Sequence, residues 1–259
     1  MRIKFSDHKR NIASIVLCTS VPIIIGIVLF LPSCKKENML DLVKGTGPMV
    51  LENRDLPVFT DIQVGINKVN VFITQDDHFD VKVQAGSHLI KLVTTEVRDG
   101  RLFIENNNKC NFMRSYKDPI NVFIHMPKLL HIYHAGAGTI QSQNTITGDT
   151  IDILTKSSGD VKMDINCYHV RTHMHSCGDI TLTGNCSEHD CYATGNGFFH
   201  GEALGTSYSW VFTRSSGDVS VVASNLLIVD IESIGDVFYS GNPPIIEKQL
   251  AGTGRLIEK

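Results

Sequence analysis

The sequence predicts an all-β protein, a β-helix or β-solenoid of about seven turns with a strand-rich capping module before it. Three observations support this fold class. A glycine motif recurs seven times at a nearly constant spacing, the residue two places before each glycine is always small, and apolar and polar residues alternate around the motif. Alternation with period two indicates strands that bury one face, and a repeat of this length is typical of solenoids.

Residues 1–33 have the three parts of a secretory signal with a lipobox. Basic residues between Arg2 and Arg10 precede an apolar run from Ile12 to Leu31, and Ser33 stands directly before Cys34. This pattern resembles a bacterial lipoprotein signal. It predicts lipidation of Cys34 and an outer membrane lipoprotein on the periplasmic face or the cell surface. The alternative is a single N-terminal transmembrane anchor, because the apolar run is long enough to span a bilayer.

The composition beyond the signal argues against nucleic acid as a partner. The chain holds 24 Lys and Arg and 27 Asp and Glu; residues 1–33 contain four and one of these, so 20 basic and 26 acidic residues remain, a net charge of −6. Nucleic-acid binding needs a basic face. Residues 34–48 are predicted to be a tether. The chain beyond the signal is long enough for one elongated domain or two small ones, and residues 49–259 together are predicted to be one domain.

Residues 49–130 are predicted to form an N-terminal β module. Alternating segments begin at Val69, Phe79, Arg101 and Ile120, without the spacing of the later repeats. Asp99-Gly100 is a typical two-residue hairpin turn. We therefore expect antiparallel strands that lead into the first coil and cap it, because an open sheet edge invites association.

Residues 131–259 contain the repeats. The second glycine of each motif sets the register, and the steps between successive glycines are 21, 19, 19, 20, 18 and 19 residues; these glycines are Gly138, Gly159, Gly178, Gly197, Gly217, Gly235 and Gly254. Two residues after each glycine comes an apolar residue, namely Ile140, Val161, Ile180, Phe199, Val219, Val237 and Leu256. Each repeat is predicted to be a strand, a tight corner, a second strand and a loop. The glycine is expected to provide backbone freedom at the corner, and the small residue close stacking.

Aspartate follows the glycine in four of the seven repeats, as Asp160, Asp179, Asp218 and Asp236. A corner aspartate can accept hydrogen bonds from backbone N–H groups, which is the structural interpretation. Calcium binding and catalysis are the alternatives. Calcium-binding nonapeptide repeats have a shorter period than this chain, which has one Gly-Asp per coil, so the spacing favours corner capping.

Several segments, taken in order, resemble one protein family. They are DLPVFTDIQVGINKVNVFITQ, VRDGRLFIEN, the MPKL before a Gly-x-Gly corner, the SGD corners, and GDVFYSGNPPIIEKQLAGTGRLIEK. From about Leu56 to the C-terminus the chain is similar to the "putative auto-transporter adhesin, head GIN domain" family. The resemblance implies a right-handed β-helix-like fold and a lipoprotein or membrane-anchored protein of a Gram-negative bacterium, and it implies no catalytic residues. The chain departs from the family at Phe198-Phe199 and in its number of cysteines.

The sequence contains no G-x-S-x-G, H-E-x-x-H, C-x-x-C or phosphate-loop motif, and no cofactor is expected. A carbohydrate-active β-helix enzyme, a polysaccharide lyase or hydrolase, is the alternative function. Such an enzyme needs two carboxylates, or a carboxylate with Lys or Arg, converging in a groove. The corner aspartates run along one edge without a clear column of basic partners, so we predict a protein that is not an enzyme.

Histidines on one predicted strand are weak candidates for metal ligands. His169, His173 and His175 fall on outward positions, and histidines two residues apart on a strand point the same way. A metal site normally needs three or four ligands, and no third ligand to His173 and His175 follows from the spacing. An exposed polar face explains these residues equally well.

Aromatic residues gather one or two repeats later. Tyr208, Trp210 and Phe212 take outward positions on the strand before Gly217, and Tyr192 falls in the same column as Phe212. These four rings either lie under a loop or the N-terminal module, or form a contact surface for sugar or protein, because exposed apolar patches usually mark interaction sites.

Two cysteines are predicted to stack on neighbouring coils. Cys167 and Cys186 each lie eight residues after a corner glycine and are 19 residues apart. Stacked Cα atoms would be about 4.8 Å apart, which is within the range of a disulfide. A pair of reduced cysteines would also pack well there.

These observations favour a non-catalytic cell-envelope lipoprotein with a binding, adhesion or structural role. Its expected partners are the membrane, through the lipid anchor, and a glycan or protein whose identity the sequence does not give.

Overall fold

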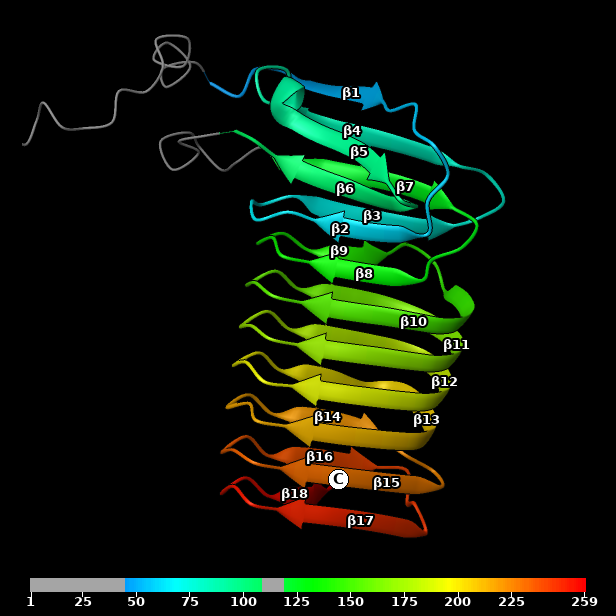
Figure 1. Cartoon of the computed structure of the whole chain (residues 1–259), viewed down its shortest axis with the longest axis vertical. Coiled ribbons are helices and arrows are strands. Elements are labelled where there is room, and N and C mark those ends of the chain that lie inside the picture. The colour runs from blue at the N-terminus through cyan, green and yellow to red at the C-terminus, as the bar shows by residue number, and fades with distance from the viewer. Residues whose placement is uncertain (1–44, 109–118) are drawn as a thin grey trace, which may run out of the picture. The chain divides into compact units, whose positions relative to one another are not determined.

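This computed structural model describes residues 45–108 and 119–259. In these residues eighteen strands are stacked coil upon coil (Figure 1). The predicted signal, Cys34 and most of the tether lie outside the described residues. The N-terminal strands are β1 (Met49–Asn53), β2 (Asp61–Val64), β3 (Asn70–Gln75), β4 (Asp80–Gly86), β5 (Val93–Arg98), β6 (Arg101–Asn106) and β7 (Asn121–Met126). A single 3₁₀ turn among the described residues, η1 (Ile90–Leu92), precedes β5.

The later strands follow the predicted repeats. They are β8 (His131–His134), β9 (Ile140–Ser142), β10 (Ile146–Thr155), β11 (Val161–Met174), β12 (Ile180–Ala193), β13 (Phe199–Thr213), β14 (Val219–Val222), β15 (Leu226–Ile231), β16 (Val237–Ser240), β17 (Ile245–Leu250) and β18 (Leu256–Glu258). Each coil has a strand before its glycine corner and a strand after it. We call the two stacks that result the pre-corner sheet and the post-corner sheet.

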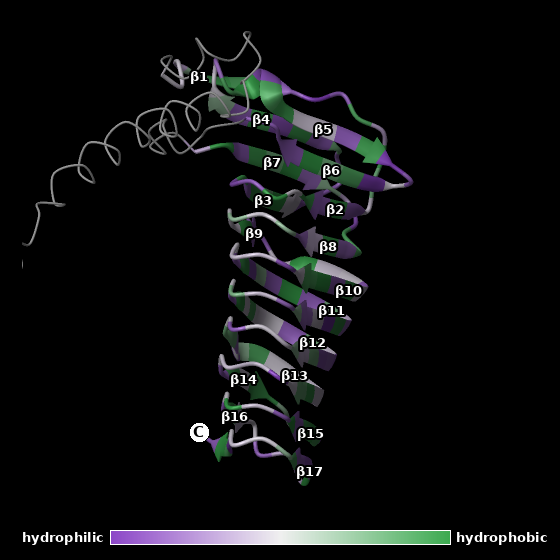
Figure 2. Cartoon of the chain, turned by 60° about the vertical axis from the view of Figure 1, so that its left-hand side comes forward, coloured by the Kyte–Doolittle hydropathy of each residue, from purple (hydrophilic) through white to green (hydrophobic). Residues whose placement is uncertain are grey.

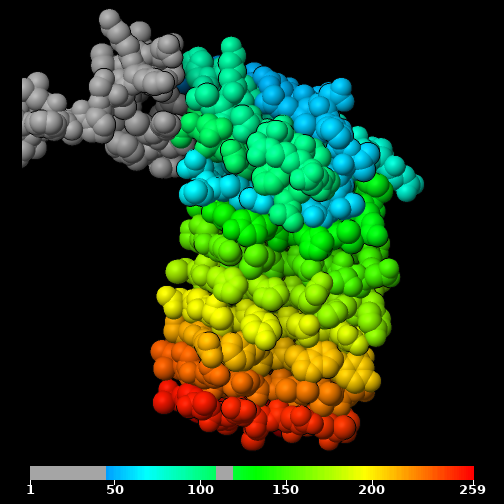
Figure 3. Space-filling model, in the orientation of Figure 1, coloured from blue at the N-terminus to red at the C-terminus, as the bar shows by residue number. Residues whose placement is uncertain are grey.

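Neighbouring coils pair in parallel, with a register shift between β12 and β13 at Thr181–Thr183. In the pre-corner sheet the order is β8, β10, β11, β12, β13, β15 and β17. In the post-corner sheet it is β9, β11, β12, β13, β14, β16 and β18. The long strands β11, β12 and β13 start in one sheet and end in the other. The predicted solenoid of about seven turns is confirmed, and Figure 3 shows the coils as successive layers of the surface.

The N-terminal strands differ from the expected antiparallel module. β2 lies between β6 and β8, and β3 lies between β7 and β9, all in parallel, so two further coils continue the same stack. Only β1, β4 and β5 run antiparallel to their neighbours and cap this end. The β5–β6 hairpin turns at Asp99 and Gly100, both with positive φ, as predicted. β6 and β7 therefore have one antiparallel and one parallel partner each. Alternation with period two does not distinguish parallel from antiparallel pairing, which is why the expectation was wrong for β2 and β3 and for the parallel partners of β6 and β7.

Inward-facing side chains form continuous columns inside the coils. The predicted apolar column two residues after each glycine is buried from Ile140 to Val237, and Leu256 in the last coil is partly buried. The pairing places Ile140, Val161, Ile180 and Phe199 one above another. Figure 2 shows the resulting alternation of hydrophobic and hydrophilic residues along the strands.

The corner glycines are required by close stacking. None of these seven glycines has a positive φ, so the expectation that the corner needs the backbone freedom of glycine was wrong. A Cβ built on Gly178 would lie 2.1 Å from the carbonyl oxygen of Gly159, and one on Gly217 would lie 2.1 Å from that of Gly197. Such contacts are sterically impossible, so only glycine allows successive corners to approach this closely.

The corner aspartates connect one coil to the next. The carboxylate of Asp179 accepts a hydrogen bond from the backbone N–H of Phe198 at 2.8 Å, and that of Asp218 accepts one from Asp236 at 2.9 Å. The capping interpretation is therefore confirmed, with the difference that each carboxylate caps the following coil instead of its own corner.

Candidate functional site

The outward side of the pre-corner sheet carries two columns of side chains that run across the coils. The aromatic column contains Tyr133, Leu154, His173, Tyr192 and Phe212, each five residues before a corner glycine. The charge column contains Asp61, His131, Asp152, Arg171, Asp190 and Trp210. We call these residues, together with Tyr208, the ladder face.

Rings in the aromatic column stack along the solenoid axis. The rings of His173 and Tyr192 lie 5.5 Å apart at 15°, and those of Tyr192 and Phe212 lie 5.1 Å apart at 39°. Cations cover both ends of the column, with Lys156 over Tyr133 at 5.4 Å and Arg214 over Phe212 at 5.1 Å. Cation–π contacts of this kind order long side chains at a surface.

Acidic and basic side chains alternate in the charge column over five coils. His131 Nδ1 lies 2.8 Å from Asp61 Oδ1, and His131 Nε2 lies 3.2 Å from Asp152 Oδ2. Arg171 donates two hydrogen bonds to the carboxylate of Asp152, at 2.5 and 2.8 Å. Fork-like pairing of this kind fixes both side chains in position.

The charge column ends in an aromatic pair. Trp210 takes the position that Asp190 has on the previous coil, and the Tyr208 ring lies 6.2 Å from it at 19°. Asp190 is paired with His169 at 2.9 Å. The charge column therefore changes along its length from charged to aromatic side chains.

The four aromatic residues predicted from the sequence share this one face. Tyr192 is 45% exposed and Tyr208 is 37% exposed, whereas Trp210 and Phe212 are half-buried. The predicted stacking of Tyr192 on Phe212 is present in the strand register.

The predicted histidine pair has no third metal ligand among the described residues. The rings of His173 and His175 lie 6.4 Å apart, but His175 is hydrogen-bonded to Thr194 at 2.6 Å and His173 stacks on Tyr192. Partial burial, with the neighbouring His175, lowers the pKa of His173. His173 is therefore part of the aromatic column, and the weak metal prediction for this pair has no support in the geometry.

Cys167 and Cys186 are direct partners on β11 and β12, as the spacing predicted. Both are buried free thiols that share a hydrogen bond. That bond lowers the pKa of Cys167 and, together with burial, raises the pKa of Cys186. A disulfide between them stays a prediction.

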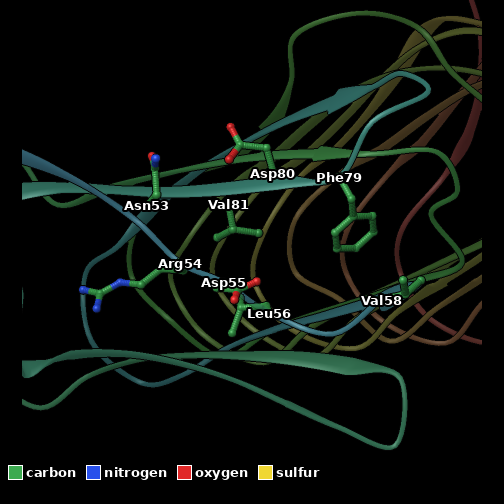
Figure 4. A pocket seen from close by; sticks show the side chains of 8 residues that line it. All are labelled: Asn53, Arg54, Asp55, Leu56, Val58, Phe79, Asp80 and Val81. Carbon is green, nitrogen blue, oxygen red and sulfur yellow. The ribbon is translucent and has the colours of Figure 1, made fainter.

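Three of the surface hollows among the described residues have volumes of about 310, 390 and 420 Å³. The first lies under the segment between β1 and β2, where Phe79 and Val81 point toward Leu56 (Figure 4). The third surrounds Cys167 and Cys186. None of these three is lined by a ladder-face residue.

The charge column was not predicted from the sequence, although its spacing repeats like that of the aromatic residues. His131, Asp152, Arg171, Asp190 and Trp210 each stand seven residues before a corner glycine. Aligning every outward position on the glycines, and not only the aromatic ones, would have found it. Asp61 could not be found this way, because β2 does not follow the repeat.

Known proteins share this fold. A crystal structure described as a putative adhesin from Bacteroides fragilis has a TM-score of 0.76 at 21% identity and covers 82% of this chain and 97% of its own. One described as a putative lipid binding protein from Parabacteroides distasonis has a TM-score of 0.67 at 20% identity, with coverages of 83% and 98%. A putative adhesin from the same species has a TM-score of 0.59 at 19% identity, with the same coverages. No curated protein sequence matches the chain significantly.

No helix in residues 45–108 and 119–259 has the length and hydropathy needed to cross a membrane.

The family model described as "Putative auto-transporter adhesin, head GIN domain" matches residues 58–243, from the segment before β2 to the segment after β16. Because this match spans most of the coils and both columns of the ladder face, the chain belongs to the head GIN domain family.

Proposed function

We propose that this chain is a non-catalytic binding protein of the cell envelope, and that it holds an extended glycan along the ladder face. The observation that carries the proposal is the pair of parallel columns, one aromatic and one charged, across neighbouring coils. Aromatic rings offer a large apolar area at low ordering cost, and carboxylates and guanidinium groups bind hydroxyl groups. A partner that repeats along its length fits a surface that repeats along its own.

The alternative of a polysaccharide-degrading enzyme has weaker support. Asp152 is held by Arg171 and His131, and Asp190 by His169, so these carboxylates are already paired on an open surface. An enzyme of this class needs a groove into which a free acid and base converge. The three hollows described above are lined by neither Asp152 nor Asp190.

A lipid chain is also a weaker candidate for the partner. One structural neighbour is described as a putative lipid binding protein. In this chain each of the three hollows is lined by polar or charged residues as well as apolar ones. A buried acyl chain would require a mostly apolar cavity.

Attachment to the outer membrane through lipid on Cys34 completes the proposal. The basic start, the apolar run and Ser33 before Cys34 support it. Substituting Cys34→Ala should abolish incorporation of labelled fatty acid, whereas a transmembrane anchor would leave the chain in the membrane without label. Protease treatment of intact cells then distinguishes the two locations, because only a chain on the cell surface would be cleaved.

Glycan binding by the purified full chain tests the function. We expect Tyr192→Ala with Phe212→Ala to lower affinity for a bound glycan by at least about tenfold, because each ring removed takes away a contact area. Phe238→Ala is the matched control, since Phe238 is a half-buried ring on the post-corner sheet. Binding to proteins alone, or a loss of affinity equal in the control, would contradict the proposal.

A further inference from the structure

Three potential metal ligands meet on the post-corner side of the N-terminal coils. Asp76 and His78 follow β3 in the loop to β4, and His125 lies on β7. One ligand atom from each residue lies within 4.8 Å of the other two. In the part of the chain that the structure describes, no other group of three His, Cys, Asp or Glu residues comes this close together.

The fold explains why residues so far apart in sequence meet. β7 lies between β3 and β4, with Thr74 and Asp80 both directly opposite His125. The backbone N–H of Asp76 donates to the carbonyl of Met126, which fixes the start of the loop against the end of β7. The loop therefore brings His78 next to His125.

The imidazoles of His78 and His125 both lie beside the carboxylate of Asp76. His125 Nδ1 lies 2.6 Å from Asp76 Oδ2, and His78 Nδ1 lies 3.5 Å from Asp76 Oδ1. The two rings are nearly parallel, 5.6 Å apart at 8°.

From this geometry we infer that Asp76, His78 and His125 bind a divalent transition metal of the zinc class. Two imidazole nitrogens and one carboxylate oxygen suit Zn²⁺, whereas Ca²⁺ and Mg²⁺ prefer oxygen ligands only. Ligands around tetrahedral zinc are about 3.3 Å apart, given bonds of about 2.0 Å. The group needs only a small closure to reach this spacing, and His78, whose side chain is 74% exposed, is free to make it.

Three protein ligands leave one position on the metal for water or for a group from outside. Asp80 is close by on β4, but it is paired with Lys82 at 2.5 Å. The site lies on the post-corner side of the solenoid, so this inference does not depend on the ladder face.

Calorimetric titration of the full chain with ZnCl₂, after treatment with a chelator, tests the inference. We expect wild type to bind one equivalent of Zn²⁺. His78→Gln should bind Zn²⁺ with an affinity at least about tenfold lower. His78 is exposed, so the variant should keep its fold, which circular dichroism verifies. Asp76→Asn should lower the affinity in the same way.

His169→Gln is the matched control. His169 also pairs with an aspartate, Asp190, at 2.9 Å, but it belongs to no group of three among the described residues. Its substitution should leave Zn²⁺ affinity unchanged. Equal affinity in wild type and His78→Gln, or an equal loss in His169→Gln, would overturn the inference.

Discussion

The carboxylate of Asp160 accepts a hydrogen bond from the backbone N–H of Asp179, the equivalent residue one coil later, at 3.1 Å. The same bond joins Asp179 to Phe198, Asp218 to Asp236, and Asp236 to Arg255. The repeated Gly-Asp of the sequence is thus a set of connections between coils. The connection is interrupted where Phe198 takes the place of aspartate.

Removing one such connection should weaken the stack locally. We expect Asp218→Ala to lower the free energy of unfolding by about 1 kcal/mol, because the N–H of Asp236 loses its acceptor. Asp218→Asn keeps an acceptor oxygen and should lose less. Urea unfolding followed by circular dichroism measures both variants, and equal midpoints for wild type and Asp218→Ala would contradict the capping role.

The corner glycines should tolerate no side chain. We expect Gly217→Ala to cost about 2–3 kcal/mol or to prevent folding, because the new Cβ would lie 2.1 Å from the carbonyl oxygen of Gly197. Gly148→Ala is the matched control, since a Cβ there meets nothing within 4 Å. If both variants melt at the same temperature, close corner stacking does not explain the repeat.

A buried imidazole should make stability depend on pH. Burial lowers the pKa of His189 to about 3, while the unfolded chain titrates near 6.5. Below about pH 6.5 the unfolded state therefore binds a proton that the folded state does not, so stability falls as the pH falls toward 3. The loss is about 2 kcal/mol at pH 5.

His189→Leu should remove this contribution. The hydroxyl of Thr172, which is hydrogen-bonded to His189, also donates to the carbonyl of Asp190. The substitution therefore leaves this hydroxyl paired. We expect the difference in unfolding free energy between pH 7 and pH 5 to shrink by about 2 kcal/mol. His134, whose pKa burial also lowers, should keep a remaining slope in the variant. An unchanged slope would show that His189 does not titrate as its burial implies.

The thiols of Cys167 and Cys186 should form a disulfide under mild oxidation. Diamide takes two electrons and two protons from such a pair and joins the two sulfur atoms. We expect mass spectrometry to find the disulfide-linked peptides of Cys167 and Cys186. The reaction should be slow, because the hydrogen bond to Cys167 and burial raise the pKa of Cys186 and so disfavour its reactive thiolate. Crosslinks only to the exposed Cys177 would contradict the pairing.

The repeats were predictable because each corner repeats the same chemistry. Gly138 to Gly254 must be glycine for steric reasons, so the period, the strands and the stacking of Cys167 on Cys186 all followed from their spacing. The N-terminal coils were not predictable in the same way. The corner after β2 reads Gly65-Ile66-Asn67 and has no second glycine, and β2 pairs with β6 and β8, which follow it much later in the chain.

The metal ligands were missed for the same physical reason. Asp76 and His78 meet His125 only because β7 lies between β3 and β4, an order that local patterns do not specify. Outward histidines near the ends of two strands were the available signal, but nothing in the sequence aligned those strands.

The fluorescence of Trp210 tests the central claim most directly, because it is the only tryptophan of the chain and lies on the ladder face. Titration of the purified full chain with a glycan identified by binding should shift or quench its emission in a saturable way. Trp210→Phe should remove the optical signal, and Tyr208→Ala should weaken binding. Saturable binding of that glycan with unchanged Trp210 emission, and unchanged affinity in Trp210→Ala, would contradict recognition by the ladder face.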